Sequence, residues 1–119
     1  MRWPVLLSYK GDNELVFIAN QAEWMLDPDF QSSHFDEGDR IIDTDGYLYQ
    51  PIKDEKGIAL VKLEEKYTLE NLIALVQAHM FEQAGATCVS KVGASSIDQV
   101  MNIMDSMNEY DKSQEASTK

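Results

Sequence analysis

The sequence predicts an α+β domain: a mostly antiparallel sheet of about five strands, with two longer C-terminal helices and one short helix packed on it. Short apolar runs separated by turn residues dominate the N-terminal half, and two long amphipathic patterns follow them. Because strands and helices come in runs instead of alternating, an α+β architecture with the helices on one face of the sheet is favoured. A length of 119 residues and a hydrophobic content of 44% suit one globular domain.

The first elements are expected to form a hairpin. Trp3 to Tyr9 reads as a strand, with Pro4 tolerated near its start. A turn cluster, Lys10 to Asn13, leads into Leu15 to Ala19. This second run is continuously apolar, which is typical of a strand that is covered on both faces.

A short helix should follow. Asn20 and Glu23 resemble a capping box, and the helix must end near Asp27 because a residue before proline avoids the helical region. Asp29 to Glu37 is expected to be a polar loop.

Three more strands are predicted. Asp39 to Thr44 and Tyr47 to Ile52 are joined at Asp45-Gly46, a strong hairpin signal. Alternation in the second of these strands gives it one aromatic face, with Tyr47 and Tyr49 on the same side. Ile58 to Leu63 is the last strand.

Two helices complete the domain. Thr68 is a natural N-cap for a helix to about Ala84, with Gly85 as its stop. An apolar connector, 86–92, leads to a capping box of Ser96 and Gln99.

The last helix is expected to end near Tyr110. Residues 1–110 then form the single α+β domain, and residues 111–119 form a flexible polar tail.

The chain resembles a small family of uncharacterised gammaproteobacterial proteins, known as a domain of unknown function. The resemblance rests on Trp3-Pro4-Val5, Asp45-Gly46, Cys88-Val89-Ser90-Lys91 and Ala94-Ser95-Ser96, and it extends over roughly residues 3–107. It implies a compact bacterial α+β domain and brings no catalytic residues with it.

Negative charge is concentrated in one region. Of a net charge of −11, eight units lie between Glu23 and Glu55, where ten acids face only Arg40 and Lys53. Such a field repels phosphate backbones and anionic lipid headgroups and attracts basic protein surfaces. We therefore expect no nucleic-acid partner and no membrane partner.

A reducing compartment is indicated by cysteine usage. Cys88 is the single cysteine, so an intramolecular disulfide is ruled out. The N-terminus shows no signal-peptide core, and no apolar run of membrane-spanning length occurs. The expected location is the cytoplasm.

Four possible site chemistries each have a simpler structural explanation. Asp43 and Asp45 resemble part of a calcium loop, but Ile41 and Ile52 stand where its first and last ligands belong. A Cys88 nucleophile with His79 as its base is less favoured than two packed core residues.

A zinc site of His34, His79 and Cys88 lacks the spacing of structural zinc. Paired carboxylates are unavoidable among 21 acids, and a solvated face explains them better. No catalytic residue, metal or cofactor is assigned.

A methionine stripe on the last helix has two interpretations. Met101, Met104 and Met107 lie at helical spacing and most simply belong to the core. Partial exposure would instead make them a homodimer surface.

We expect a non-catalytic protein-binding or regulatory module that engages a basic protein surface. Acids would steer the partner and aromatic residues would anchor it; the candidate residues are Phe30, Phe35, Asp36, Glu37, Asp39, Asp43, Asp45, Tyr47 and Tyr49. The competing interpretation is that the acids only confer solubility and the aromatics point inward. The alternative function is a small enzyme or enzyme subunit using Cys88 or a carboxylate pair, and an inhibitor that mimics nucleic-acid charge is a third.

Overall fold

The computed structural model describes residues 1–84 and 93–117, with side chains for residues 1–82 and 93–107. The described strands are β1 (Val5–Ser8), β2 (Leu15–Ile18), β3 (Arg40–Ile42), β4 (Tyr47–Asp54) and β5 (Gly57–Lys66). The described helices are α1 (Gln21–Leu26), α2 (Pro28–Ser32), α3 (Leu69–Ala84) and α4 (Ile97–Ser117).

The five strands form one antiparallel sheet in the order β2-β1-β3-β4-β5. The predicted α+β class and both predicted hairpins, β1–β2 and β3–β4, are confirmed. Strand β3 is the central strand, β1 lies between β2 and β3, and β5 pairs with β4 and forms an edge.

The β3–β4 turn depends on one glycine. The Asp43 N–H donates to the Tyr47 carbonyl, and the Gly46 N–H donates to the Asp43 carbonyl, each at 3.0 Å. Gly46 has φ +88°, and no non-glycine residue among the described ones has positive φ. Of the Asp-Gly pair, therefore, Gly46 alone needs glycine's conformational freedom.

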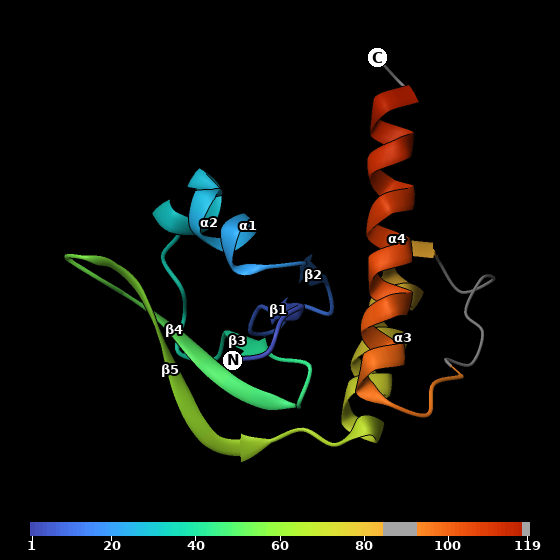
Figure 1. Cartoon of the computed structure of the whole chain (residues 1–119), viewed down its shortest axis with the longest axis horizontal. Coiled ribbons are helices and arrows are strands. Elements are labelled where there is room, and N and C mark those ends of the chain that lie inside the picture. The colour runs from blue at the N-terminus through green and yellow to red at the C-terminus, as the bar shows by residue number, and fades with distance from the viewer. Residues whose placement is uncertain (85–92, 118–119) are drawn as a thin grey trace.

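Helices cover both faces of the sheet, so the expectation that all lie on one face was wrong (Figure 1). Alternation along the strands explains this: Leu6 and Ile42 face α3 and α4, whereas their neighbours Leu7 and Ile41 face the opposite way. On that opposite face the core includes Trp24 of α1. Because the central strands are apolar on both sides, each face needs its own cover.

The predicted N-cap residues Asn20, Thr68 and Ser96 each accept a bond from a backbone N–H at the start of their helix. Thr68 Oγ1 accepts from the Asn71 N–H at 3.2 Å, and Ser96 Oγ accepts from the Gln99 N–H at 3.3 Å. At α1, Asn20 Oδ1 accepts from the Glu23 N–H at 2.9 Å, while the Glu23 carboxylate reaches back to the Ala19 N–H at 3.0 Å.

Two predicted boundaries were wrong. Helix α2 occupies part of the expected loop because Asp27 accepts from the Asp29 N–H and Pro28 stands at the start of the helix. Helix α4 continues to Ser117, past Tyr110, since no glycine or proline interrupts it there. Gly85 and the connector 86–92 lie outside the described residues.

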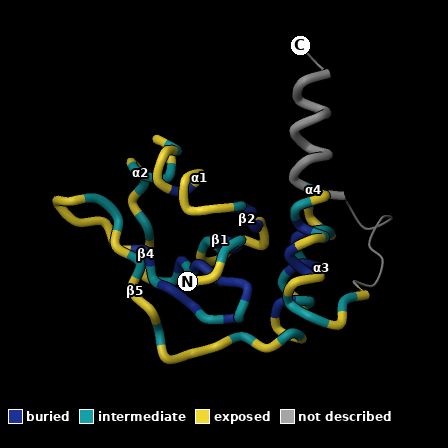
Figure 2. The backbone as a smooth tube through the Cα atoms, viewed as in Figure 1, coloured by how far each residue is buried: buried dark blue, intermediate teal, exposed yellow. Residues whose placement is uncertain are grey.

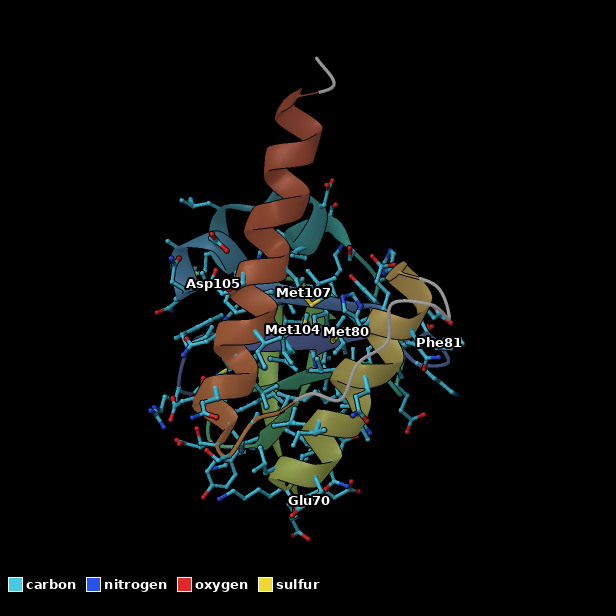
Figure 3. All side chains as sticks on the ribbon, turned by 90° about the vertical axis from the view of Figure 1, so that its right-hand side faces the viewer. Glu70, Met80, Phe81, Met104, Asp105 and Met107 are labelled. Atoms are coloured by element: carbon cyan, nitrogen blue, oxygen red, sulfur yellow. The ribbon has the colours of Figure 1, made fainter. Side chains whose placement is uncertain are left out.

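The methionine stripe lies in the core. Met101 and Met104 are each 2% exposed, and Met107 is half-buried against the same cluster. Figure 3 shows Met80, Met104 and Met107 gathered between α3 and α4, while Phe81 points outward from α3. Met101 and Met104 therefore offer no surface in this structure to a second copy of the chain.

Replacing Gly46 by alanine should destabilise the fold, because a Cβ would collide with the Tyr67 carbonyl oxygen and φ would be unfavourable. Gly11 is a matched control, since it also has positive φ (+77°) but has open space around it. Urea unfolding should show Gly46→Ala losing about 2 kcal/mol more than Gly11→Ala. Equal losses would mean that the contact with Tyr67 is unimportant.

A candidate protein-binding surface beside the N-terminal arm

A buried carboxylate organises the β3–β4 turn. Asp43 is 1% exposed, and its Oδ1 accepts from the N–H groups of Asp45 and Tyr47, both at 2.9 Å. Its Oδ2 accepts from the Tyr49 hydroxyl at 3.1 Å and from the Arg2 N–H at 3.3 Å. Four donors satisfy this carboxylate inside the protein, which makes its burial tolerable.

The same turn holds the N-terminal arm, residues 1–4. The Thr44 N–H donates to the Arg2 carbonyl at 3.1 Å, and the Thr44 hydroxyl donates to the Pro4 carbonyl at 2.7 Å. The Arg2 guanidinium also contacts Asp45 at 2.7 Å and Asp98 of α4 at 3.1 Å. Because these ion pairs are exposed, we attribute most of the arm's placement to the backbone bonds.

Fixing the arm completes a pocket of about 330 Å³. Its walls come from the arm, from α1 and α2, and from the edge strand β5; they are Met1, Trp3, Gln21, Trp24, Met25, Gln31, Ile58 and Leu60. Gln31 is oriented by a 2.8 Å bond from its Nε2 to the Trp24 carbonyl. Six of the eight wall residues are apolar, but the surface that they and the two amides expose inside the hollow is more polar than apolar, which suits an apolar side chain with a polar neighbour.

Two pocket walls and one neighbouring residue in the chain are exposed apolar side chains. Met1 is 45% exposed, Met25 59% and Leu26 80%. Figure 2 shows α1 and much of β5 coloured as exposed, in contrast to the buried strands between the layers. Large apolar side chains gathered around a hollow are typical of an interaction surface.

The charged residues in the segment beside the pocket are all acids. Between Lys10 and Arg40 the chain contains eight acids and no lysine or arginine. Asp39 is buried and Asp27 is half-buried, while Asp12, Glu14, Glu23, Asp29, Asp36 and Glu37 are exposed. We call α1, α2 and the loop to Glu37 the acidic layer; it holds five of these acids, Glu23, Asp27, Asp29, Asp36 and Glu37. Lys53 of β4 donates to the Ser32 carbonyl of this layer at 3.1 Å, and the net negative field that remains favours cationic partners.

Three of the residues predicted for a partner surface are buried. Asp39 and Asp43 are 3% and 1% exposed, and Tyr49 is 7% exposed. Asp39 accepts from the Lys10 N–H at 2.8 Å and from the Asp36 N–H at 2.7 Å, so it fixes a loop. These side chains cannot contact a partner in this structure.

Phe30 and Phe35 are half-buried. Their rings lie 5.3 Å and 6.0 Å from the Trp24 ring, so they support the acidic layer from within. Asp36 and Glu37 are exposed as expected.

Tyr47 and Asp45 lie in a different setting. Lys62 and Lys66 of β5 place their ammonium groups 3.8 Å and 4.6 Å from the centre of the Tyr47 ring. Asp45 is paired with Arg2. This end of the sheet is therefore not an anionic surface, and only Asp36 and Glu37 of the predicted acids belong to the acidic layer with exposed side chains.

The geometry gives little support to a calcium site at Asp43 and Asp45, to a Cys88–His79 pair or to a zinc site. Asp43 is saturated by protein donors and Asp45 is paired with Arg2, so the calcium ligands are already engaged. His79 is buried, and its Nδ1 accepts from the Leu15 N–H at 3.0 Å, whereas His34 is exposed. Cys88 lies outside the described residues.

Among the described residues there is neither a cluster of metal-binding side chains nor a membrane-spanning helix. No group of three or more histidine, cysteine or acidic side chains comes together there in a way that suits a metal ion. None of the helices in that part of the chain has the length and apolar character needed to cross a bilayer.

The pocket itself was missed by sequence reasoning. Its walls come from segments far apart in the chain, and only the strand order brings Ile58 and Leu60 beside Trp24. The buried Asp43 had a visible signal, since Asp43-Thr44-Asp45-Gly46 is a pattern in which the first carboxylate binds backbone N–H groups further along the turn. For Trp24, the available signal was a large aromatic side chain on a short helix, because such a side chain is usually largely buried.

Tyr49 should make the fold sensitive to alkali. Burial, together with its bond to Asp43, raises the pKa of Tyr49 to about 12. A raised folded-state pKa stabilises the fold below the unfolded value near 10, and this stabilisation is lost as pH rises toward 12. Tyr9, whose pKa burial also raises, adds to the loss in the same direction.

Tyr49→Phe tests this assignment. The variant should lose about 1 kcal/mol at pH 7 through the missing hydrogen bond and should show a shallower fall in unfolding free energy above pH 10. Denaturant unfolding between pH 7 and pH 11 measures both effects. Parallel curves for the two proteins would contradict the assignment.

Comparisons with known proteins agree with the fold. A search of curated proteins found no match. The NMR structure of a protein from Shewanella amazonensis matches with a TM-score of 0.61 at 23% sequence identity, covering 89% of each chain. That likeness shows a shared fold.

A match to a family model identifies the family to which the chain belongs. Residues 3–104 match the model DUF4144, which is described as a protein structure with unknown function. The suspected membership of an uncharacterised domain family is thereby confirmed. This chain belongs to the DUF4144 family.

Proposed function

We propose that this protein is a non-catalytic binding or regulatory module whose acidic layer and adjoining pocket engage a basic surface of another protein. The observation that carries the proposal is the location of the pocket: a hollow of about 330 Å³, walled mainly by apolar residues, lies between β5 and the α1–α2 segment, which holds Glu23, Asp27 and Asp29 and no lysine or arginine. The proposed setting is the cytoplasm, in keeping with a single cysteine.

Charge and apolar area have separate tasks in this proposal. Exposed acids at the rim steer a cationic partner and raise its association rate, and they add little to the lifetime of the complex. Affinity comes from an anchor that fills the pocket and contacts Trp3 and Trp24. Preformed walls keep the ordering cost of binding low.

The arrangement also supports binding over catalysis. Among the residues whose side chains are described, the two buried carboxylates, Asp39 and Asp43, accept bonds from backbone N–H groups near their own turns. A group saturated in this way is committed to structure, whereas a general acid or base must reach a substrate. The pocket walls contain two amide side chains and no ionisable one.

Charge reversal tests the acidic layer. Asp29, Asp36 and Glu37 are exposed, and the hydrogen bonds described for them use backbone atoms, so lysine at all three should leave the fold intact. In a tagged pull-down from native cells at low salt, the amount of basic partner captured by the triple variant should be at least tenfold lower than that captured by the unchanged protein.

A matched control carries the same change of charge elsewhere. Glu64 and Glu65 of β5 and Glu70 in the first turn of α3 are also exposed, and Glu70 matches Asp29 in its place near a helix start. Lysine at these three positions should reduce capture less than threefold. Equal losses in both triple variants would contradict a localised binding surface.

A further inference from the structure

We propose that the partner binds as an extended basic segment that adds a sixth strand along Gly57–Val61 of β5 and inserts an apolar side chain into the pocket. This inference rests on the proposed function and specifies its binding mode. Within the described residues β5 pairs only with β4, so its outer side is an open sheet edge. Open edges present unpaired N–H and C=O groups to an incoming strand.

The register shows which backbone groups face this open edge. Glu55 and Lys56 form a two-residue turn between Asp54 and Gly57, which oppose each other. Residues that flank such a turn exchange both backbone hydrogen bonds, and bonded pairs then alternate along the ladder. By this alternation Ala59 and Val61 bond to β4, whereas the N–H and C=O groups of Ile58 and Leu60 point outward.

Pro51 agrees with this assignment. It opposes Leu60, and a proline has no N–H to contribute to a bonded pair. The Pro51–Leu60 pair therefore has to be one of the non-bonded pairs, which leaves the backbone groups of Leu60 free for the outer side.

Only one end of this edge is protected against strand addition. The register of β4 and β5 shifts between Tyr47 and Tyr49, and Lys62 and Lys66 lie over the Tyr47 ring. Bulges and lysines are the features by which edge strands avoid pairing. Gly57–Val61 carries no charge and lies outside this irregular stretch, so pairing is open there and is resisted from Lys62 onward.

The two residues whose backbone N–H and C=O groups face the open edge also contribute their side chains to the pocket wall. Ile58 and Leu60 line the pocket beside Trp24, on the face of the sheet that α1 and α2 cover. Every second side chain of an added strand points to that same face. A strand hydrogen-bonded to Ile58 and Leu60 thus carries its apolar residues past the mouth of the pocket.

Charge determines the chemistry and orientation of this segment. The face with the pocket adjoins the acidic layer, which contains no lysine or arginine of its own and receives one ammonium group from outside, since Lys53 Nζ donates to the Ser32 carbonyl of α2 at 3.1 Å. The other face of the β4–β5 hairpin holds a hollow lined by Val61 and Leu63, with Glu37, Arg40 and Lys53 among its walls, so positive and negative groups are mixed there. Lysine or arginine on the added strand is therefore favoured on the pocket face, beside the exposed Glu23 and Asp29 of α1 and α2.

A designed peptide tests the binding mode. The blocked peptide Lys-Thr-Leu-Thr-Leu-Thr-Lys places lysine and leucine on one face and neutral threonine on the other. Backbone amide exchange in the whole protein, resolved by NMR, should slow at least tenfold at Ile58 and Leu60 when the peptide saturates it. Exchange at Ala59 and Val61 should change little, because β4 already protects them.

Two matched peptides serve as controls. Glutamate in place of both lysines should weaken binding at least tenfold at low salt. N-methylation of the backbone on one edge of the peptide should abolish binding, while N-methylation on the other edge should leave it nearly unchanged. A loss of the same size from either edge would overturn strand addition.

Two other outcomes would also overturn this inference. One is peptide binding without slower exchange at Ile58 and Leu60, and the other is absence of binding. Either would leave the proposed function to be judged separately by the reversal of Asp29, Asp36 and Glu37, since that experiment does not depend on the geometry of the bound segment.

Discussion

The Asp43 carboxylate is the interaction on which this architecture most depends. It is buried with four donors, and these come from the N-terminal arm, the β3–β4 turn and Tyr49 in the core. One side chain thus sets the turn that aligns two strands and also anchors the arm that carries Met1 and Trp3 to the pocket. Removing a buried charge-assisted bond leaves its partners unsatisfied, which is costly, so fold and candidate surface share one constraint.

The pocket follows from how unevenly the two sheet faces are covered. The face with Leu6 and Ile42 lies under two long helices, whereas the other lies under two short helices and an N-terminal arm. A thin cover buries Trp24 yet leaves Met25 and Leu26 exposed at its rim. Together with the acids of the acidic layer, this places a hollow walled mainly by apolar residues beside net negative charge, which is the chemistry that the proposed cationic partner with an apolar anchor requires.

Much of the fold was predictable because its signals are local. Capping residues such as Thr68 and Ser96, the Asp45-Gly46 turn and the apolar run from Leu15 placed most elements near their observed positions. The candidate surface was predicted only in part, because burial of an acid depends on which donors surround it. Asp36 and Asp39 look alike in sequence, yet one is exposed and the other bonds two backbone N–H groups. Strand order, which brings β5 beside the acidic layer, is a long-range property without a local signal.

Site-specific photo-crosslinking in the native cell tests the central claim most directly. A photoreactive residue in place of Met25, exposed at the pocket, would be compared with one in place of Phe81, exposed on α3 (Figure 3). If the pocket and the acidic layer bind a basic partner, the Met25 position captures a protein through a peptide rich in lysine or arginine around an apolar residue, and the Phe81 position does not. Capture from Phe81 alone, or crosslinked peptides without basic residues at Met25, would contradict it.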